Sequence, residues 1–451
     1  MDRIGIFQSV EEDFQAWTAA AARRGEGAYY SSKTVLHEVG DRSGQVVGLT
    51  SNEKASLTSD MSPVMDFCTL QVLVERMKTY AYVHNHIADS DVSFTELTQL
   101  LKSAGPDYHL GAPPEARRLY RELQEIREHM RGRIERHIDT GTSAPMELLD
   151  GSVHSLLERW QSELSASGRA YTNPDILLGG GDGASSVLGD MHAMPFLTPA
   201  AFAAAPSETE VWETTRSFLA DLCAPEKPAF LTHRRPSFVA YVPDLGEVAL
   251  ELDGVASVPD GRRAAFESLM VRVKEGGFHY RATTHDGVEM TVMPLTRAAN
   301  TFSRYSSALQ RTARVYPVKL LDIGRWLAAP GWRSIGQLPR LLFNGVVVHR
   351  RTWEVSAAEW IAKNGDPHTS LRNLGELTDR SLPRFCYVKG EGDPKPLLVD
   401  FADPISAELF LWMARNQTSV ELTEMLPGPE SLWLRGPDGR HTSELRCVYS
   451  R

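Results

Sequence analysis

The spacing of apolar residues changes near residue 170, and this change restricts the folds that the chain can adopt. Before it, residues 115–137 form one apolar helical face, with spacings of three and four, through Leu119, Leu123, Ile126, Met130 and Ile134. After it, short apolar runs bounded by Gly and Pro are typical of strands. Strands and helices then mix without a regular βαβ rhythm. We therefore predict an α+β fold, with a helical N-terminal third followed by a mixed strand/helix region with antiparallel sheets.

Three regions follow from this division. They are a mostly helical region at 1–170, an α+β region at 171–330 with a Gly-rich turn and an arginine helix, and a C-terminal α+β region at 331–451. Further helices are expected at 146–165, 208–221, 262–274, 300–313, 356–363 and 404–415. Strands are expected at Ile176–Leu178, Phe238–Val242, Glu247–Leu252, Val288–Met293, Gly345–His349, Arg384–Lys389, Pro396–Phe401, Ser419–Glu424 and Ser443–Tyr449.

The composition restricts partners and location. A formal net charge of −10 over 451 residues lacks the basic footprint of most nucleic-acid binders, so any RNA contact must come from a local patch. The N-terminal segment MDRIGIFQSVEEDFQAW does not resemble a signal peptide, and no apolar run reaches the length of a membrane span. We therefore expect a cytoplasmic protein without a membrane partner. The cysteines show neither CxxC nor Cys/His spacing, which predicts reduced thiols.

A row of arginines is the strongest candidate binding feature. Arg297, Arg304 and Arg311 are seven residues apart, and Arg314 follows three residues later. On one helix, the first three would lie within about 40° of one another and Arg314 about 60° further round. Such a row offers planar donor forks to phosphate or carboxylate oxygens. The alternative interpretation is a solvated helix face.

Two other motifs carry weaker indications. The Gly-rich segment Leu177–Asp190 lacks the Lys of a phosphate-binding loop, which favours a tight turn. Gly189-Asp190-Met191-His192 is similar to a metallophosphoesterase metal motif, but no GDxxD or GNHE follows, so a structural turn is the alternative and no metal is expected. The chain has no GxSxG, HExxH or paired Cys/His signature of a nucleophile.

Longer segments carry a family resemblance. They are LPRLLFNGVVVHRRTWEV (338–355), LPRFCYVKGEGDPKPLLVDFADP (382–404) and VELTEMLPGPESLWLRGPDGRHTSELRCVY (420–449). Their order resembles the closing part of the N-terminal, or glutamylation, domain of lantibiotic dehydratases. Weaker similarities are VLGDMHAM (187–194), which resembles a GE/D-x-H turn of small family members, and VMPLTRAAN (292–300), which resembles their PxxxAxN segment.

The segment YYSSKTVLHEVGDR (29–42) resembles the family's GRTxxYED strand, with departures. Ser32-Lys33 stand where Gly-Arg is usual, and Val39 stands where the Asp would be, which removes a bidentate donor and a charge. The resemblance thus covers the C-terminal part of the domain, and it implies that another protein carries the missing N-terminal half.

The resemblance also implies an activity. Family members transfer glutamate from glutamyl-tRNA to Ser or Thr hydroxyls of a ribosomal precursor peptide in natural-product (RiPP) biosynthesis. The chain would then be one part of a split aminoacyl-tRNA-dependent enzyme, with aminoacyl-tRNA and the precursor peptide as partners and no bound cofactor. The catalytic residues expected from it are Lys33, Asp190, His192 and Arg297. The residues expected to bind tRNA or another anion are Arg297, Arg304, Arg311, Arg314 and Arg384.

Two alternatives stay open. The chain could be a catalytically inert subunit that binds leader peptide or a partner enzyme, which its acidic charge and altered motif favour. It could also be a stand-alone peptide aminoacyl-tRNA ligase, for which ATP would be a co-substrate.

Overall fold

The computed structural model describes most of the chain after residue 47. The described residues are 16, 48–87, 90–104, 111–142, 144–166, 168–179, 186–195, 208–232, 244–252, 256, 258–274, 277–295, 306–320, 337–356, 382–390, 396–415, 417–436 and 439–451. The chain divides into two compact units. The first, Met1–Gly48 with Ala203–Pro206, lies almost entirely outside the described residues, so the description concerns the second, Leu49–Phe202 with Ser207–Arg451.

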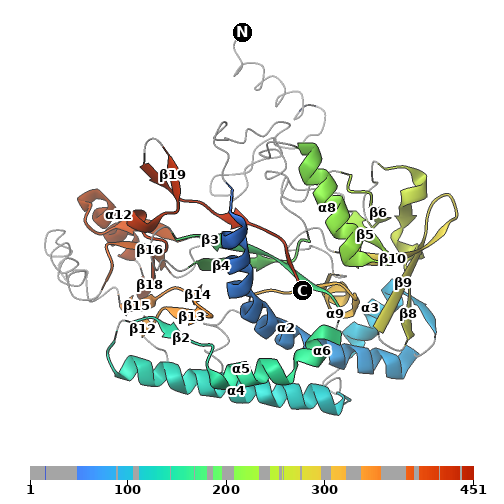
Figure 1. The fold of residues 1–451 in the computed structure, drawn as a ribbon, viewed down its shortest axis with the longest axis horizontal. Coiled ribbons are helices and arrows are strands. Elements are labelled where there is room, and N and C mark those ends of the chain that lie inside the picture. The colour runs from blue at the N-terminus through green and yellow to red at the C-terminus, as the bar shows by residue number, and fades with distance from the viewer. Residues whose placement is uncertain are drawn as a thin grey trace, which may run out of the picture. The chain divides into compact units, whose positions relative to one another are not determined.

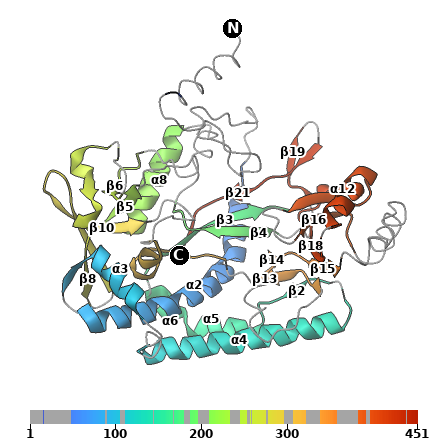
Figure 2. The ribbon, with the colours of Figure 1, turned by 180° about the vertical axis from the view of Figure 1, so that it is seen from behind.

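Helices dominate the first part of this unit. They are α2 (Ser51–Ile87), α3 (Phe94–Ser103), α4 (Pro114–Asp139), α5 (Gly151–Arg159) and α6 (Gln161–Ala166). The 37 residues of α2 span roughly 55 Å, because an α-helix rises 1.5 Å per residue. It contacts α4, α5 and α6 (Figure 1) and also α3 and α9 (Ser306–Thr312) (Figure 2). One helix therefore contributes to two hydrophobic cores, through Met61–Val74 to the first and through Val83 to the second.

A seven-stranded mixed sheet surrounds the second core within the described residues. Its order is β1 (Asp91–Ser93), β8 (Met270–Lys274), β9 (Gly277–Thr283), β10 (Glu289–Leu295), β5 (Lys227–Thr232), β6 (Val248–Glu251) and β7 (Arg263–Ala265). Strands β1 to β10 in this order are antiparallel, whereas β10, β5, β6 and β7 are parallel. Helix α8 (Glu208–Cys223) precedes β5 and packs against it.

An eight-stranded sheet lies on the first core, again counting described residues. Its order is β11 (Tyr316–Pro317), β3 (Ala170–Leu177), β4 (Val187–His192), β14 (Val346–His349), β13 (Leu341–Phe343) and β2 (Met146–Glu147). Two C-terminal strands, β21 (Leu445–Arg446) and β22 (Tyr449–Ser450), also pair with β3. Asn344 and Gly345, at φ 53° and 79°, form the β13–β14 turn, as an Asn-Gly pair does in a two-residue hairpin.

The third sheet is antiparallel and belongs to the C-terminal part. Its order is β12 (Gln337–Leu338), β15 (Thr352–Ser356), β18 (Ser419–Glu424), β16 (Phe385–Gly390) and β17 (Leu397–Asp400). Helix α12 (Pro404–Ala414) covers it with Ala407, Phe410, Leu411 and Ala414. A small hairpin of β19 (Leu434–Gly436) and β20 (Gly439–His441) follows.

The α+β class is confirmed, including the helical N-terminal third and the antiparallel sheets. The strand predicted at Glu247–Leu252 corresponds to β6, but strands β5 and β7 and the parallel pairing of β10, β5, β6 and β7 were not predicted. The expected helix at 262–274 is wrong: short 3-10 turns and strands β7 and β8 occupy it. The expected strand at 238–242 and helix at 356–363 lie outside the described residues, apart from Ser356, which ends β15. The division into regions 1–170, 171–330 and 331–451 stays a prediction.

Candidate anion-binding site

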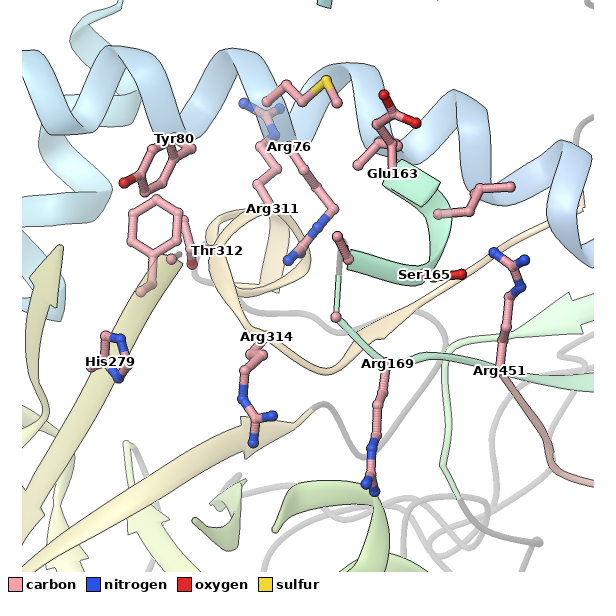
Figure 3. Close-up of a pocket in the computed structure, with 17 residues that line it drawn as sticks. Arg76, Tyr80, Glu163, Ser165, Arg169, His279, Arg311, Thr312, Arg314 and Arg451 are labelled. Atoms are coloured by element: carbon pink, nitrogen blue, oxygen red, sulfur yellow. The ribbon is translucent and has the colours of Figure 1, made fainter. Parts of the chain in front are cut away.

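A pocket of about 840 Å³ opens between helices α2, α6 and α9 and strand β9. Figure 3 shows five arginine side chains around it, from separate parts of the chain. They are Arg76 on α2, Arg169 before β3, Arg311 on α9, Arg314 after α9, and Arg451. Sequence analysis singled out only Arg311 and Arg314.

Helix α2 supplies one wall through a single face. Leu73, Arg76, Met77 and Tyr80 recur at spacings of three and four, so they project on the same side of the helix. Phe278 of β9 lies against Tyr80, with ring centroids 6.0 Å apart in an edge-to-face arrangement. The wall is therefore partly apolar and aromatic, as in most small-molecule sites.

Gly168 brings Arg169 to the pocket. Its φ is +94°, and a Cβ at this position would collide with the backbone carbonyl oxygen of Arg314. Only glycine adopts such a φ at little cost, and only a residue without a side chain allows the two backbones to approach this closely. The two arginines consequently enter the pocket from adjoining segments (Figure 3).

Two of the five guanidinium groups are neutralised by carboxylates. Arg314 pairs with Glu226 and also donates to the carbonyl oxygens of Cys223 at 3.1 Å and Ala224 at 2.8 Å. The Nε atom of Arg451 lies 2.7 Å from an Asp66 oxygen. These contacts fix both side chains. The positive charges of Arg314 and Arg451 are therefore largely compensated by carboxylates of the protein itself.

The other three have no carboxylate partner in the part of the chain that the structure describes. Arg76 stacks over the Tyr316 ring at 3.9 Å and donates to the carbonyl oxygen of Gln310 at 3.3 Å. Burial lowers the pKa of its guanidinium, because a cation removed from water is destabilised. The side chains of Arg169 and Arg311 make no hydrogen bond or ion pair with described residues.

The lining therefore carries an excess of positive charge. Among the described residues that line it, the carboxylate-bearing side chain is Glu163, which accepts a hydrogen bond from Ser162 at 2.6 Å. Uncompensated guanidinium groups in a concave, partly apolar site attract an anion that accepts several donors, such as phosphate. We identify this pocket as the candidate functional site.

A second polar cluster lies on strands β3 and β4. His192 Nε2 is 2.8 Å from Asp175 Oδ2, and the Arg446 guanidinium is 3.2 Å from Asp175 Oδ1. The hydrogen bond to Asp175 raises the pKa of His192, and burial opposes this effect. Asp190 is exposed and accepts from the Met191 amide at 2.7 Å.

The structure places the other predicted residues differently. Arg384 was expected to begin a strand, but it precedes β16. Its side chain is 61% exposed and forms a bidentate pair with Asp400 at 2.8 and 2.9 Å. It does not contribute to the pocket lining. Arg311 lies in the last turn of α9, which ends at Thr312, and Arg314 lies beyond that end, so the two do not share a continuous helix. Lys33, Arg297 and Arg304 lie outside the described residues.

Two further properties concern metals and membranes. Among the described residues, no group of three or more His, Cys, Asp or Glu side chains is arranged to hold a metal ion. Within the same part of the chain, no helix combines the length and the apolar character needed to cross a bilayer.

Solved structures share this fold. The glutamylation domain TbtB from thiomuracin biosynthesis, bound to 5′-phosphodesmethylglutamycin, matches 87% of this chain with a TM-score of 0.59 and 18% identity. A second structure of that domain matches 87% of the chain with a TM-score of 0.58 and 17% identity. The chain spans 49% of the TbtB chain in both comparisons.

A third structure is less similar. The tRNA-dependent lantibiotic dehydratase MibB from Microbispora sp. 107891 matches 66% of this chain and 30% of its own, with a TM-score of 0.46 and 12% identity. No family model and no curated protein matches the chain. The TbtB likeness shows the fold, which is that of a glutamylation domain, and it confirms the fold that the sequence resemblance implied.

Proposed function

We propose that this chain, with the fold of a glutamylation domain, binds aminoacyl-tRNA and takes part in transferring the aminoacyl group to a ribosomally made precursor peptide. The five-arginine pocket carries the proposal. It offers three guanidinium groups without a carboxylate partner among the described residues, and these would contact phosphates of the tRNA acceptor end.

The charge distribution supports a local contact. The whole chain has a net charge of −10, which repels RNA at long range. A concave cluster of guanidinium groups overcomes this repulsion at one place, so binding is confined to the segment of RNA that enters the pocket. Arginine suits this task because its planar fork donates two hydrogen bonds to one phosphate.

The chemistry itself places few demands on the protein. The ester at the tRNA 3′ end is already activated, and a peptide hydroxyl attacks its carbonyl carbon while the tRNA 3′ oxygen leaves. The protein must hold donor and acceptor together and stabilise the negative charge that develops on the carbonyl oxygen. Holding the acceptor end by its phosphates is the contribution that we assign to the pocket.

An RNA-binding measurement tests the proposal. A fluorescent RNA hairpin ending in single-stranded CCA is titrated with the full chain and followed by anisotropy. We expect Arg169→Ala and Arg311→Ala each to weaken binding about tenfold, which corresponds to about 1.4 kcal/mol for one charged hydrogen-bonding contact. The matched control is Arg118→Ala, an exposed arginine on α4 that does not line the pocket. Equal affinity of all four proteins would refute the assignment of the pocket.

Transfer is tested separately. Aminoacylated tRNA and Ser/Thr-containing precursor peptides are incubated with the chain, with and without ATP and the proteins encoded beside it, and the peptides are weighed by mass spectrometry. A mass increase that needs a companion protein supports a split enzyme, and one that needs ATP but no companion supports the ligase. Absence of both RNA binding and transfer supports the inert subunit.

A further inference from the structure

Two strands of the eight-stranded sheet bring a polar face together. Asp190 and His192 alternate along β4, so both side chains project on one side of the sheet, while Met191 between them is buried in the core. Asp175 lies on the adjacent strand β3, within hydrogen-bonding distance of His192. An acid and an imidazole thus face each other from neighbouring strands.

A β-bulge sets this geometry. The β3–β4 register shifts between Pro174 and Ile176, which places Asp175 at the irregularity. A bulge re-aims a side chain out of the regular alternation, and bulges often lie next to functional sites. Gly189 on β4 makes room for it, because a Cβ there would lie 3.3 Å from the Asp175 Cβ.

Asp175 makes its one side-chain hydrogen bond among the described residues to His192, and it also forms an ion pair with Arg446 of β21. Its Oδ1 atom is buried and accepts no hydrogen bond from described residues, although the Arg446 guanidinium is 3.2 Å away. By contrast, Asp150, which lies 2.7 Å from His129, also caps helix α5 through two backbone amides. A buried carboxylate whose main hydrogen bond goes to an imidazole is typical of a residue that orients a histidine.

The free ring nitrogen follows from this contact. A carboxylate oxygen accepts a hydrogen bond, so Nε2 of His192 carries the proton that points to Asp175, and Nδ1 of the neutral ring carries a lone pair. The described residues supply no partner for Nδ1. The charged groups that face the ring are Asp175 on β3, Asp190 on its own strand and Arg446 on β21.

We propose that His192 is the proton acceptor for the hydroxyl of the acceptor peptide, with Asp175 as its positioning residue. The inference rests on the proposed function. Nδ1 of His192 takes the hydroxyl proton as the peptide oxygen forms a bond to the ester carbonyl carbon. The bond between that carbon and the tRNA 3′ oxygen then breaks, and His192 returns the proton to the leaving 3′ oxygen. Nothing is oxidised or reduced.

The state of the ring is measured first, without any substrate. Histidines of the full chain are labelled with ¹⁵N and followed by NMR as pH changes, with His192→Gln used for assignment. We expect the Nε2–H tautomer and a pKa of His192 above the ordinary 6.5, because the hydrogen bond to the Asp175 carboxylate stabilises the imidazolium. Asp175→Asn removes that anion and should lower the pKa. An Nδ1–H tautomer, or a pKa that Asp175→Asn leaves unchanged, would overturn the proposal.

Transfer is measured second, with glutamyl-tRNA and a Ser/Thr peptide as probes. His192→Gln should slow transfer by roughly 10²- to 10⁴-fold, the usual contribution of a general base, and leave affinity for the RNA hairpin unchanged. The wild-type rate should rise with pH through the His192 pKa, and the residual activity of Asp175→Asn should rise at lower pH. His285→Gln is the control, since His285 also pairs with a carboxylate, Glu251, at 2.8 Å.

The outcomes separate the two proposals. Transfer by His192→Gln at the wild-type rate would refute the role of His192 even if the arginine pocket binds RNA. A chain that binds no RNA hairpin refutes the proposed function, and the tautomer and pKa of His192 still decide whether Asp175 and His192 form the pair.

Discussion

Salt dependence gives the sharpest test of the pocket, because its slope can be worked out from the guanidinium groups that the described residues place in the lining without a carboxylate partner. Arg76, Arg169 and Arg311 have no carboxylate partner among the described residues, so each can neutralise one phosphate. Each phosphate contact on single-stranded nucleic acid contributes about −0.7 to the slope of log K against log salt. Three contacts predict a slope of about −2, so affinity should fall roughly 20-fold between 50 and 200 mM KCl.

The Arg169→Ala/Arg311→Ala double variant leaves one contact. Its slope should be about −0.7, and its affinity should fall only roughly threefold over the same range. The assay is fluorescence anisotropy of a labelled CCA-ended RNA across a KCl series. Arg118→Ala, an exposed substitution on α4, should keep the wild-type slope. A double variant with an unchanged slope would show that the RNA binds elsewhere, whatever its affinity.

Three further outcomes concern stability and reactivity. Gly168→Ala should lower the free energy of unfolding in urea by more than about 1–2 kcal/mol, because it adds a collision to the cost of a positive φ. Gly141 has φ +65° and no atom within 4 Å of an added Cβ, so Gly141→Ala should lower the free energy of unfolding by the conformational cost alone. Glu424→Ala should lower the free energy of unfolding by about 3 kcal/mol, because it leaves Arg340 without its carboxylate partner. The Arg340 guanidinium donates to both Glu424 carboxylate oxygens at 2.8 Å. Burial raises the pKa of two thiols to about 12, so Ellman's reagent at pH 8 should modify them only on unfolding: Cys223 and Cys386.

Local pattern was sufficient where one element buries one face. The spacing in 115–137 predicted α4 (Pro114–Asp139), and its five apolar residues are all buried. The strand predicted at Ser419–Glu424 has the same bounds in the structure.

Local pattern failed where two spacings compete. In 262–274, Phe266 and Leu269 are three apart, which indicates a helix, but Leu269, Val271 and Val273 alternate. The alternation prevails because β8 pairs with both β9 and β1, so the sheet satisfies its backbone groups on both edges. Such pairing is decided by distant segments and has no local signal.

The sequence predicted the chemical character of the candidate site, but not which residues form it. The sequence indicated arginines that bind an anion, and Arg311 and Arg314 line the pocket. Arg76, Arg169 and Arg451 come from helices and strands far apart in the chain, and each looks like an ordinary surface arginine in its own segment. Asp175 was not predicted as a site residue for a similar reason, because its contact with His192 depends on a β-bulge between β3 and β4.

Strand β3 connects the arginine pocket with the Asp175–His192 pair, and its length determines how long a bound aminoacyl-tRNA segment must be to reach both. Arg169 directly precedes the strand and Asp175 is six residues further on, so their Cα atoms are about 20 Å apart at about 3.3 Å per residue. Pairing with β4, β11, β21 and β22 makes this spacer rigid. A stacked RNA strand covers that span with roughly six nucleotides at about 3.4 Å each. The phosphates that contact the arginines would then lie roughly six nucleotides from the ester, and a trinucleotide bearing the ester would reach only one of the two places.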